Sequence, residues 1–437
     1  MTSYLALLGL LIAAGIPYIL WTRLEARKHQ RAAIVHEDVA QMGDDVAPAS
    51  LHPEIDLDIC IGSGACVRAC PEKEILGITD GRARLINPLS CVGHSACMQA
   101  CPVGAIKLVF GTATRGLELP MLTPKYETTC AGIYIIGELT GMGLIRNATM
   151  QGGQVAATIA KTGRRASAGD VDVLVVGAGP AGIAAALGCT ANGLSVKIVE
   201  QSVYGGTIAH YPRSKIVMTG TLELPGYGTV RKKTMQKEDL LALWEDIRAR
   251  VHLDLQEGVR VESIARDGAA WRVVGTGGFT ERAPTVILAL GRRGAPRTLG
   301  IPGEELPKVV YRLLEPEPFA GKHVMVVGGG NAAADCAIAL AESELCSSVS
   351  LSYRKSQLAR LRGTVRTRLE TLMREQRVVP YLGTELVSIE ADHVSLKRGA
   401  TLERIPNDHV IVQIGGTSPS ELLKTIGIEL VEKRGEA

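Results

Sequence analysis

Six of the ten cysteines lie in two short runs that have the same spacing. The runs cover residues 60–71 and 91–102, and each ends in Cys-Pro. Thiolates this close in sequence are typical ligands of metal ions and clusters, whereas disulfide frameworks belong to small secreted domains. The runs therefore predict metal sites in a protein that works in a reducing compartment. Their cysteines are Cys60, Cys66, Cys70, Cys91, Cys97 and Cys101.

The repeat of the two runs, with an Asp80-Gly81 hairpin turn between them, resembles the two-cluster bacterial ferredoxins over residues 53–110. That family carries the run Cys-x2-Cys-x2-Cys-x3-Cys-Pro, and the fourth cysteine of each run ligates the other cluster. The resemblance implies two iron-sulfur clusters. Their ligand sets would be Cys60, Cys66 and Cys101 for one cluster, and Cys91, Cys97 and Cys70 for the other.

The second ligand position of each run departs from the ferredoxin pattern, because Ser63 and His94 stand where cysteine is expected. The residues leave several outcomes open. Serine alkoxide and imidazole could be the fourth ligands of 4Fe-4S clusters, the clusters could be of the 3Fe-4S type, or the sites could have lost their metal. If His94 binds iron, its neutral ring should raise the potential of that cluster, as histidine does in Rieske centres.

A glycine fingerprint follows the apolar strand predicted over residues 171–176. A helix is predicted after it to about residue 191, and a second strand over residues 195–199. The glycines allow the tight turn and let a pyrophosphate approach the helix N-terminus. Glu200 ends the second strand, where an acidic residue binds the 2′-hydroxyl of an adenosine ribose. The fingerprint glycines are Gly177, Gly179 and Gly182.

A second fingerprint covers residues 324–335 and predicts a second dinucleotide site. The strand after it, residues 349–353, ends without an acidic residue and is followed by basic ones. Guanidinium and ammonium groups favour the 2′-phosphate of NADPH, whereas a carboxylate would favour NADH. A solvated basic face is the alternative for Arg362 and beyond. The predicted site residues are Gly328, Gly330, Asn331, Ala333, Arg354, Lys355 and Arg360.

Residues 129–152 form a further motif, which precedes both fingerprints. They predict a buried strand over 133–136, a Gly137-Glu138 turn and a helix from about residue 144 to 160. This motif resembles the last one of the thioredoxin-reductase-like flavoproteins, in which the acidic residue meets the ribityl chain of FAD. A loop that resembles the flavin-ring loop of the same family contributes Gly205, Gly206 and Thr207.

The position of that motif implies a circular permutation. In a family member of ordinary order, the strand, turn and helix would follow the return strand that begins near residue 407, but only a short apolar stretch and a polar tail follow it here. Permutation is tolerated where chain termini lie close together at the surface. The alternative is that residues 133–160 are an unrelated linker helix.

Thiol-disulfide exchange at the place used by thioredoxin reductases is excluded, because residues 309–318 contain no cysteine. The four cysteines outside the two runs are isolated in sequence and are better interpreted as small buried hydrophobic residues. The resemblance therefore implies that NAD(P)H reduces the flavin and that the fused clusters take the electrons. The isolated cysteines are Cys130, Cys189, Cys336 and Cys346.

The N-terminus contains an uncharged run over residues 4–21, which as a helix is about 27 Å long and just spans a hydrocarbon core of about 30 Å. No basic residue precedes it, whereas Arg23, Arg27, Lys28 and Arg31 follow it. The positive-inside rule then predicts a single-pass protein of the inner membrane with its domains in the cytoplasm. A cleaved signal peptide and a buried globular helix are the alternatives.

The chain of 437 residues is long enough for several domains, and its formal charge of only +3 predicts no nucleic-acid partner. The expected fold class is α/β, with two Rossmann-like domains, a small α+β ferredoxin domain and one transmembrane helix. A homodimer is compatible with this. The expected parts are an anchor (1–22), a tether (23–52), the ferredoxin domain (53–110), the permuted FAD segment (111–165), the FAD domain (166–295), the NAD(P) domain (296–405) and a return to the FAD domain (406–437).

The expected function is transfer of electrons from NAD(P)H through FAD and two clusters to a membrane partner, either a quinone-reactive or a haem protein. No side chain need act as a general acid or base, because the cofactors supply the chemistry. One alternative resembles the flavoprotein subunits of glutamate synthase and transhydrogenases, which serve soluble partners. Another is a redox sensor with negligible turnover.

Overall fold

The computed structural model describes residues 2–41, 48, 50–72, 74–211, 213, 215–292, 297–361, 363–416 and 419–436. In the first helix, the side chains are described from Gly15 onward, except those of Asp38 and Gln41. The chain divides into two compact units. One contains residues 1–116 and 434–437, and the other contains residues 117–433.

The first unit contains the ferredoxin-like repeat and the N-terminal helix. The first and last strands of the repeat pair antiparallel, and a hairpin lies between the two cysteine runs. Asp80 and Gly81 have φ values of 51° and 70°, as a two-residue hairpin turn requires, so this turn is confirmed. The elements are α1 (Thr2–Gln41), β1 (His52–Ile55), α2 (Ala65–Ala69), β2 (Leu76–Thr79), β3 (Arg82–Leu85), α3 (Ala96–Gln99) and β4 (Ile106–Val109).

Helix α1 continues to Gln41, through residues 23–41 that we assigned to a polar tether. This part contains no glycine or proline and is rich in good helix formers, which explains the difference. Ala32 is buried, and a Cβ at Gly77 of β2 would lie 2.7 Å from the Cβ of Ala32, so α1 packs on the hairpin. The rest of the predicted tether includes residues 42–47 and 49, which lie outside the described residues.

No helix among the described residues is long and apolar enough to cross a membrane. Most of the apolar run predicted as an anchor falls on residues 1–14, whose side chains lie outside the described set. The described side chains at the end of this run and just after it include large, exposed hydrophobic residues. These are Ile16, Tyr18, Ile19, Leu20, Trp21 and Leu24.

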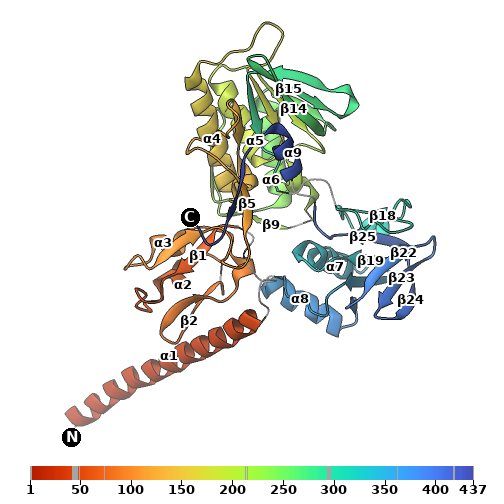
Figure 1. The fold of residues 1–437 in the computed structure, drawn as a ribbon. Helices are drawn as coiled ribbons and strands as arrows, with labels where there is room; N and C mark the ends of the chain where they lie inside the picture. Colours follow the sequence, from red (N-terminus) through yellow and green to blue (C-terminus); the bar gives the residue numbers. More distant parts are fainter. Residues whose placement is uncertain are drawn as a thin grey trace. The chain divides into compact units, whose positions relative to one another are not determined.

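The second unit is α/β, as predicted, and is built around two five-stranded parallel sheets (Figure 1). The first sheet has the order β13-β8-β7-β17-β6 and the second has the order β18-β25-β19-β20-β21. Each is accompanied by a three-stranded antiparallel sheet, β14-β15-β16 and β22-β23-β24 respectively. In the first sheet, β7 and β17 are almost wholly apolar and buried along their whole length, as expected for parallel strands covered on both faces, and β19 and β25 of the second sheet are buried after a first histidine.

Residues of the first half of this unit form the sheet and helices around the first fingerprint. These elements are β5 (Leu117–Pro120), β6 (Ile133–Ile135), α4 (Ile145–Thr162), β7 (Val173–Val176), α5 (Pro180–Ala191), β8 (Val196–Glu200), β9 (Ile216–Met218), β10 (Thr221–Leu224), β11 (Gly228–Arg231), β12 (Thr234–Gln236), α6 (Lys237–Arg250), β13 (Asp254–Glu257), β14 (Val261–Asp267), β15 (Ala270–Gly275), β16 (Thr280–Ala283) and β17 (Thr285–Leu288).

The second half of the unit forms the sheet around the second fingerprint. After β25 the chain returns to the first sheet. Leu423, Ile426 and Ile428 near the end of the chain lie in the same buried cluster as Ile133 of β6 and Leu174 of β7. The elements are β18 (Val309–Val310), β19 (His323–Val327), α7 (Asn331–Ser343), β20 (Ser348–Tyr353), α8 (Gly363–Arg374), β21 (Val379–Leu382), β22 (Glu385–Ile389), β23 (His393–Arg398), β24 (Thr401–Pro406), β25 (His409–Val412), α9 (Ser420–Ile426) and β26 (Leu430–Lys433).

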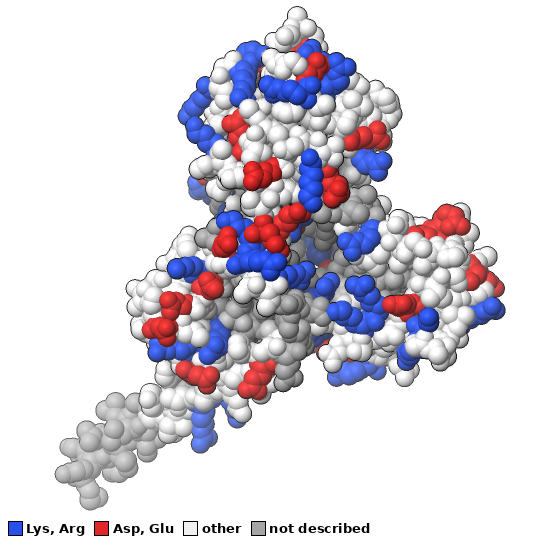
Figure 2. Space-filling view, viewed as in Figure 1, with Lys and Arg blue, Asp and Glu red and all other residues white. Residues whose placement is uncertain are grey.

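On the face shown in Figure 2, basic and acidic side chains are interspersed within each unit, in line with the small net charge. The details that matter for ligands lie in the turns at the carboxyl ends of the parallel strands, where dinucleotides bind in such sheets.

Candidate cofactor sites

The first fingerprint lies in the turn between β7 and α5. Gly177 has a φ of 108°, and a Cβ there would lie 2.4 Å from the carbonyl oxygen of Ala289. A Cβ at Gly182 would lie 1.9 Å from the carbonyl oxygen of Gly177. Gly179, by contrast, has open space on its Cβ side. The turn therefore requires glycine at two positions for packing and leaves the third open, which fits the approach of a pyrophosphate to the N-terminus of α5.

Glu200 ends β8 beside this turn and is only 6% exposed. Its carboxylate accepts hydrogen bonds from the backbone N–H groups of Ala178 (2.8 Å) and Ser202 (2.9 Å). A carboxylate has about four lone-pair sites, so two backbone donors leave acceptor capacity for ribose hydroxyls. The residues present fit an adenosine ribose at this position.

The Gly137-Glu138 turn follows β6, which pairs parallel with β17 in the same sheet. A network of buried side chains holds this turn. Gly137 N–H donates to Gln151 Oε1 (2.7 Å), Gln151 Nε2 donates to Thr140 Oγ1 (3.0 Å), and Thr140 Oγ1 donates to the Gly137 carbonyl (2.9 Å). Glu138 itself is exposed. The network therefore fixes the turn that presents Glu138 at the end of the sheet.

Gln151 is fully buried, and our sequence analysis did not identify it as a site residue. The only indication in the sequence is its position before two glycines on a helix, which predicts close packing rather than a polar role. The tertiary structure brings its amide to a turn that lies more than ten residues earlier in the chain. Sequence periodicity cannot show such a contact.

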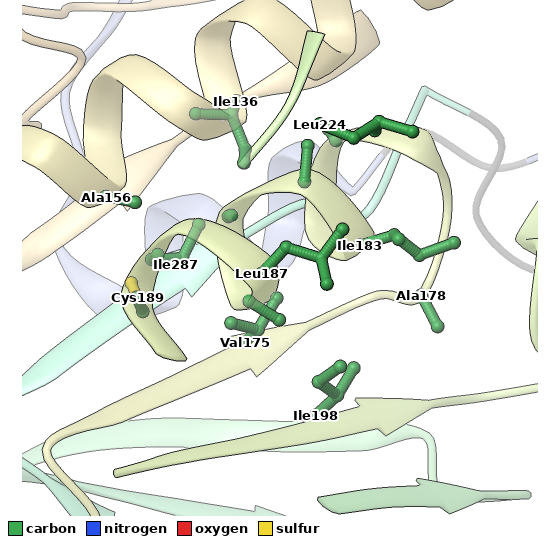
Figure 3. Close-up of a cluster of buried hydrophobic side chains, with 14 of the residues drawn as sticks. Ile136, Ala156, Val175, Ala178, Ile183, Leu187, Cys189, Ile198, Leu224 and Ile287 are labelled. Atoms are coloured by element: carbon green, nitrogen blue, oxygen red, sulfur yellow. The ribbon is translucent and has the colours of Figure 1, made fainter. Parts of the chain in front are cut away.

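Helix α4 packs closely on α5, and this places residues 133–162, the early segment, in the core of the first sheet (Figures 1 and 3). A Cβ at Gly152 would lie 2.5 Å from the carbonyl oxygen of Ala181, and one at Gly188 would lie 2.6 Å from the Cβ of Ala156. Figure 3 shows Ile136 and Ala156 of the early segment in the same cluster as Leu187 of α5. Residues 133–162 are therefore an integral part of the first nucleotide-binding fold.

The loop that resembles the flavin-ring loop packs on the first fingerprint. Gly205 and Gly206 are buried and have φ values of 90° and 59°, and a Cβ at Gly206 would lie 3.2 Å from the Cα of Gly179. Gly205 N–H donates to the carbonyl of Ala178 (3.0 Å), while Thr207 is exposed. The two glycines are thus needed for close backbone approach beside the pyrophosphate position.

The second fingerprint repeats the geometry of the first. Gly328 has a φ of 148°, and a Cβ there would lie 2.3 Å from the carbonyl oxygen of Gln413 and 3.0 Å from the Cβ of Ala333. Ala333 is fully buried, Gly330 has open space on its Cβ side, and Asn331 is the first residue of α7. The turn therefore fits a second dinucleotide at the N-terminus of α7.

The basic residues predicted for NADPH follow β20. Arg354 and Arg360 are exposed, and Lys355 is half-buried. The backbone here is held by hydrogen bonds from Thr384 N–H to the Tyr353 carbonyl (3.2 Å) and from Gly383 N–H to the Lys355 carbonyl (3.0 Å). Arg362 lies outside the described residues.

The cysteines of the two runs line two small cavities in the first unit. Each cavity combines cysteines from both runs, in the crossed pattern that the ferredoxin resemblance implies. The structure brings Cys60, Cys66, Cys101 and Ser63 together around one cavity, and Cys91, Cys97, Cys70 and His94 around the other.

Burial raises the pKa of the thiols of Cys66, Cys70 and Cys91, and raises that of Cys97 to about 11. Unligated, these groups stay neutral near pH 7, and cluster binding would deprotonate them. Among the described residues, no group of three or more His, Cys, Asp or Glu side chains converges on one point as a single metal ion requires. Each thiolate of a cluster binds its own iron, so cluster ligands surround a space instead.

Comparisons with known proteins agree with both parts. The 4Fe-4S dicluster domain family matches residues 52–102, and the pyridine nucleotide-disulphide oxidoreductase family matches residues 174–436. A ferredoxin–NADP reductase from Ignicoccus hospitalis is 30% identical over 59% of this chain and 82% of its own. The bacilliredoxin reductase Bdr of Bacillus subtilis is 25% identical over 60% and 82%.

Among solved structures, the bacillithiol disulfide reductase Bdr from Bacillus cereus is similar, with a TM-score of 0.52 and 24% identity over 60% of this chain and 82% of its own. At this identity the likeness shows the fold alone. The family match, by contrast, covers more than half of the chain. The chain therefore belongs to the pyridine nucleotide-disulphide oxidoreductase family and is an FAD-dependent NAD(P)H oxidoreductase with a fused 4Fe-4S dicluster domain.

Proposed function

We propose that this protein transfers electrons between NADPH and a membrane-bound redox partner, using FAD and two iron-sulfur clusters carried on one chain. The observation that carries the proposal is the presence of two dinucleotide turns and two three-cysteine cavities in the same chain. When bound, NADPH and FAD supply two-electron chemistry and the clusters supply one-electron chemistry.

The chain's own residues bind and position these groups. Gly177, Gly179, Gly182 and Glu200 would hold the pyrophosphate and adenosine of FAD. The N-terminus of α4 follows Leu144, which makes no side-chain cap, so its N–H groups are available to a negatively charged flavin edge. NADPH is favoured over NADH by the basic residues after β20. The clusters would be of the 4Fe-4S type, or of the 3Fe-4S type if Ser63 and His94 do not bind iron.

The membrane part of the proposal is supported by the sequence of the N-terminal helix. Its uncharged run ends in exposed Tyr18 and Trp21, and basic residues follow. We propose a single-pass anchor with the folded units in the cytoplasm. In cell fractionation the full chain should stay with the membrane after carbonate washing. Substitution of Leu8 and Leu11 by Arg should release it, and an unanchored wild-type chain would refute this part.

Circular permutation of the FAD fold is supported by the placement of β6 and α4. Both lie outside the residues that the family matches, yet they complete the first sheet and its core. A rearranged chain that carries residues 117–165 after residue 433 should therefore retain FAD. Loss of FAD from a folded rearranged chain would contradict the permutation.

The decisive experiment is analysis of the anaerobically purified full chain for iron, acid-labile sulfide and flavin, followed by reduction with NADPH or NADH. We expect one FAD per chain, with about eight irons for 4Fe-4S clusters or about six for 3Fe-4S clusters. NADPH should bleach the flavin and generate the EPR signal of reduced clusters. A chain that retains flavin but no iron, or clusters that NADPH cannot reduce, would contradict the proposed function.

A soluble acceptor is the second candidate, because similar proteins are named ferredoxin–NADP reductases. Reduction of added ferredoxin by NADPH, undiminished when the N-terminal helix is made polar, would favour it. A redox sensor is separated from both enzymes by its rate. Turnover below about one per minute would favour the sensor, against a median enzyme rate of about 10 per second.

A further inference from the structure

The two cluster cavities differ in the side chains at their rims. The first cavity is the one lined by Cys60, Cys66 and Cys101, and the second is the one lined by Cys70, Cys91 and Cys97. Ile61 and Val103 line the first cavity and are 61% and 39% exposed. Ile59, beside the first cysteine of the run, is also exposed. Ile59, Ile61 and Val103 therefore give the first cavity an apolar rim that faces solvent.

The matching positions of the second cavity lack such a rim. Ile61 corresponds to Val92, since each follows the first cysteine of its run, and Val92 is half-buried. Val103 corresponds to Glu72, since each follows the Cys-Pro that ends its run, and Glu72 is charged and half-buried. Exposed apolar side chains that gather beside a functional site mark a surface that docks on something apolar. This property belongs to the first cavity.

Helix α1 presents one face to the ferredoxin fold. Ala32 on this face is buried and packs on Gly77 of β2. Residues three or four positions apart lie on the same face of a helix, so Glu25, Trp21 and Tyr18 continue this face towards the N-terminus. Tyr18 and Trp21 are exposed, and their ring centroids are 6.3 Å apart. The face that packs on the fold therefore leads to an exposed aromatic pair.

The first cavity lies beside the part of α1 that follows this aromatic pair. Arg68 Nη2 donates to the carbonyl of Ser63, which lines the first cavity (3.1 Å). The pKa of Glu25 is lowered mainly by its hydrogen bond with Lys28, and the charge of Arg68 contributes to this shift. Arg68 thus links the first cavity to Glu25, which lies only four residues after Trp21, a rise of about 6 Å along the helix.

The second cavity lies beside a later part of the same helix. Arg31 of α1 pairs with Glu74 (3.8 Å), in the segment that follows Cys70 and Pro71 at the wall of the second cavity. Arg31 lies ten residues after Trp21, a rise of about 15 Å. Along α1, the first cavity is therefore the nearer of the two to the aromatic pair.

We infer that the apolar rim and the aromatic pair of α1 face the bilayer together, and that the cluster held by Cys60, Cys66 and Cys101 is the one that delivers electrons to an acceptor dissolved in the membrane. Trp and Tyr side chains favour the level of the lipid headgroups. Exposed Ile and Val side chains bury apolar area in the same layer. The second cluster would then be the inner of the two.

The acceptor class that such a surface reaches is a lipophilic quinone. One NADPH, one proton and one quinone give NADP⁺ and the quinol, and the cluster passes the two electrons one at a time. The inference rests on the proposed function, because it requires clusters that NADPH reduces and a chain that α1 anchors. It goes further by naming the cluster, the surface and the acceptor.

The first test measures which cluster lies near lipid. The full chain is bound to vesicles of phosphatidylcholine and phosphatidylglycerol, reduced with dithionite, and studied by EPR with a nitroxide-labelled lipid. Cys70→Ala keeps the first cluster and Cys101→Ala keeps the second. The nitroxide should speed the relaxation of the cluster in Cys70→Ala several-fold and leave that in Cys101→Ala nearly unchanged, because dipolar relaxation falls steeply with distance.

The second test measures reduction of ubiquinone by NADPH in the same vesicles. Ile59→Asn combined with Ile61→Asn should lower the rate about tenfold, since two apolar side chains lose their contact with lipid. Met98→Asn is the matched control, because Met98 is an exposed apolar residue beside Cys97 of the second cavity, and its rate should stay within about twofold of the wild type. Iron content and the dithionite-reduced EPR signals show that the clusters are intact.

Ile59→Asn alone keeps the second test decisive if the double variant loses iron, because Ile59 does not line the cavity. Two results would overturn the inference. One is relaxation by the labelled lipid that is equal for both clusters or stronger in Cys101→Ala. The other is a rim variant with intact clusters that reduces ubiquinone as fast as the wild type.

Failure of the proposed function gives different results. A full chain that does not float with the vesicles refutes the anchor, and with it this surface. Clusters that stay oxidised with NADPH refute the electron path from the coenzyme, whereas the relaxation test still decides which cluster faces the bilayer, since it uses dithionite. A vesicle-bound chain whose two clusters relax equally refutes the inference alone.

Discussion

The two cysteine runs of the ferredoxin-like unit have nearly the same backbone at their loops. They have different side chains at the second ligand position of each run. Gly62 and Gly93 have φ values of 69° and 74°, and the residues two places later, Gly64 and Ser95, have φ values of 66° and 65°. Each of these later residues precedes a short helix that carries the middle cysteine of its run. The cluster loops are therefore the same structural unit used twice.

The difference lies in the residue between the two left-handed positions. In the first run this residue is Ser63, which is exposed, and in the second it is His94, which is half-buried. Backbone conformation and cysteine spacing thus set where a cluster sits, whereas the side chain at this one position can set its charge and potential. The two runs therefore share the backbone that positions a cluster and differ in the side chain that can set its charge and potential.

The largest effect should come from breaking the crossed ligand sets. Cys101→Ala, although it lies in the second run, should remove the cluster held by Cys60 and Cys66, because all three line one cavity. Cys70→Ala should remove the other cluster. Each variant should contain about half the wild-type iron.

Pulsed EPR can show which cluster each variant loses. If His94 binds iron, the nitrogen coupling of its ring should persist in Cys101→Ala and vanish in Cys70→Ala. The opposite pattern, with each variant losing the cluster of its own run, would show that the runs are not crossed.

A smaller effect is expected from making the two runs alike. His94→Cys replaces a neutral ligand by an anionic thiolate, so the potential of that cluster should fall by about 100 mV or more in an EPR redox titration. Ser63→Cys is the matched control in the first run, and exchanges one anionic ligand for another if serine binds as alkoxide. A larger shift in the control than in His94→Cys would refute the assignment of the imidazole as a ligand.

The thiols themselves should differ in reactivity once the clusters are removed. Burial raises the pKa of Cys97 to about 11, so at pH 8 its thiolate fraction is roughly a hundredfold below that of a thiol with a pKa near 9. Iodoacetamide should therefore label Cys97 of the folded, metal-free protein about a hundredfold more slowly than an exposed thiol. The rate should rise with pH up to about 11.

The same shift affects the stability of the metal-free protein. Because the folded-state pKa of Cys97 is raised, its contribution to stability is present below about pH 9 and is lost as the pH rises towards 11. Mass spectrometry of the protein treated with iodoacetamide at a series of pH values measures the rate at which Cys97 is labelled. Labelling of Cys97 at the speed of a small-molecule thiol at pH 8 would contradict the described burial.

The smallest effect concerns Ser95, a residue other than glycine in the left-handed region. Ser95→Gly should stabilise the second run by about 1 kcal/mol, and Gly64→Ser should destabilise the first by a similar amount. For a small domain this corresponds to a shift of about 4 °C in the thermal transition. If both substitutions lower the transition, the Ser95 hydroxyl contributes more than its backbone costs.

Much of the site could be predicted from the sequence because it depends on local spacing. The resemblance of the two runs to two-cluster ferredoxins implied the crossed ligand sets, and the order of strand, glycines and helix predicted the two glycine turns. The sequence analysis assigned residues 23–41 to a tether and did not predict that they are helical. They continue α1 because helix formers dominate a segment without glycine or proline, and Ala32 packs against β2.

Sequence alone thus determined the kinds of cofactor and the backbone turns that receive them, since these depend on residues close together in the chain. Only the tertiary structure decided contacts between distant residues, such as Gln151 with the Gly137 turn and the Tyr353 ring with Gly329. The reason is physical. The structural role of a glycine beside an aromatic ring, or of a buried amide beside a turn, depends on a neighbour that folding brings within a few ångströms.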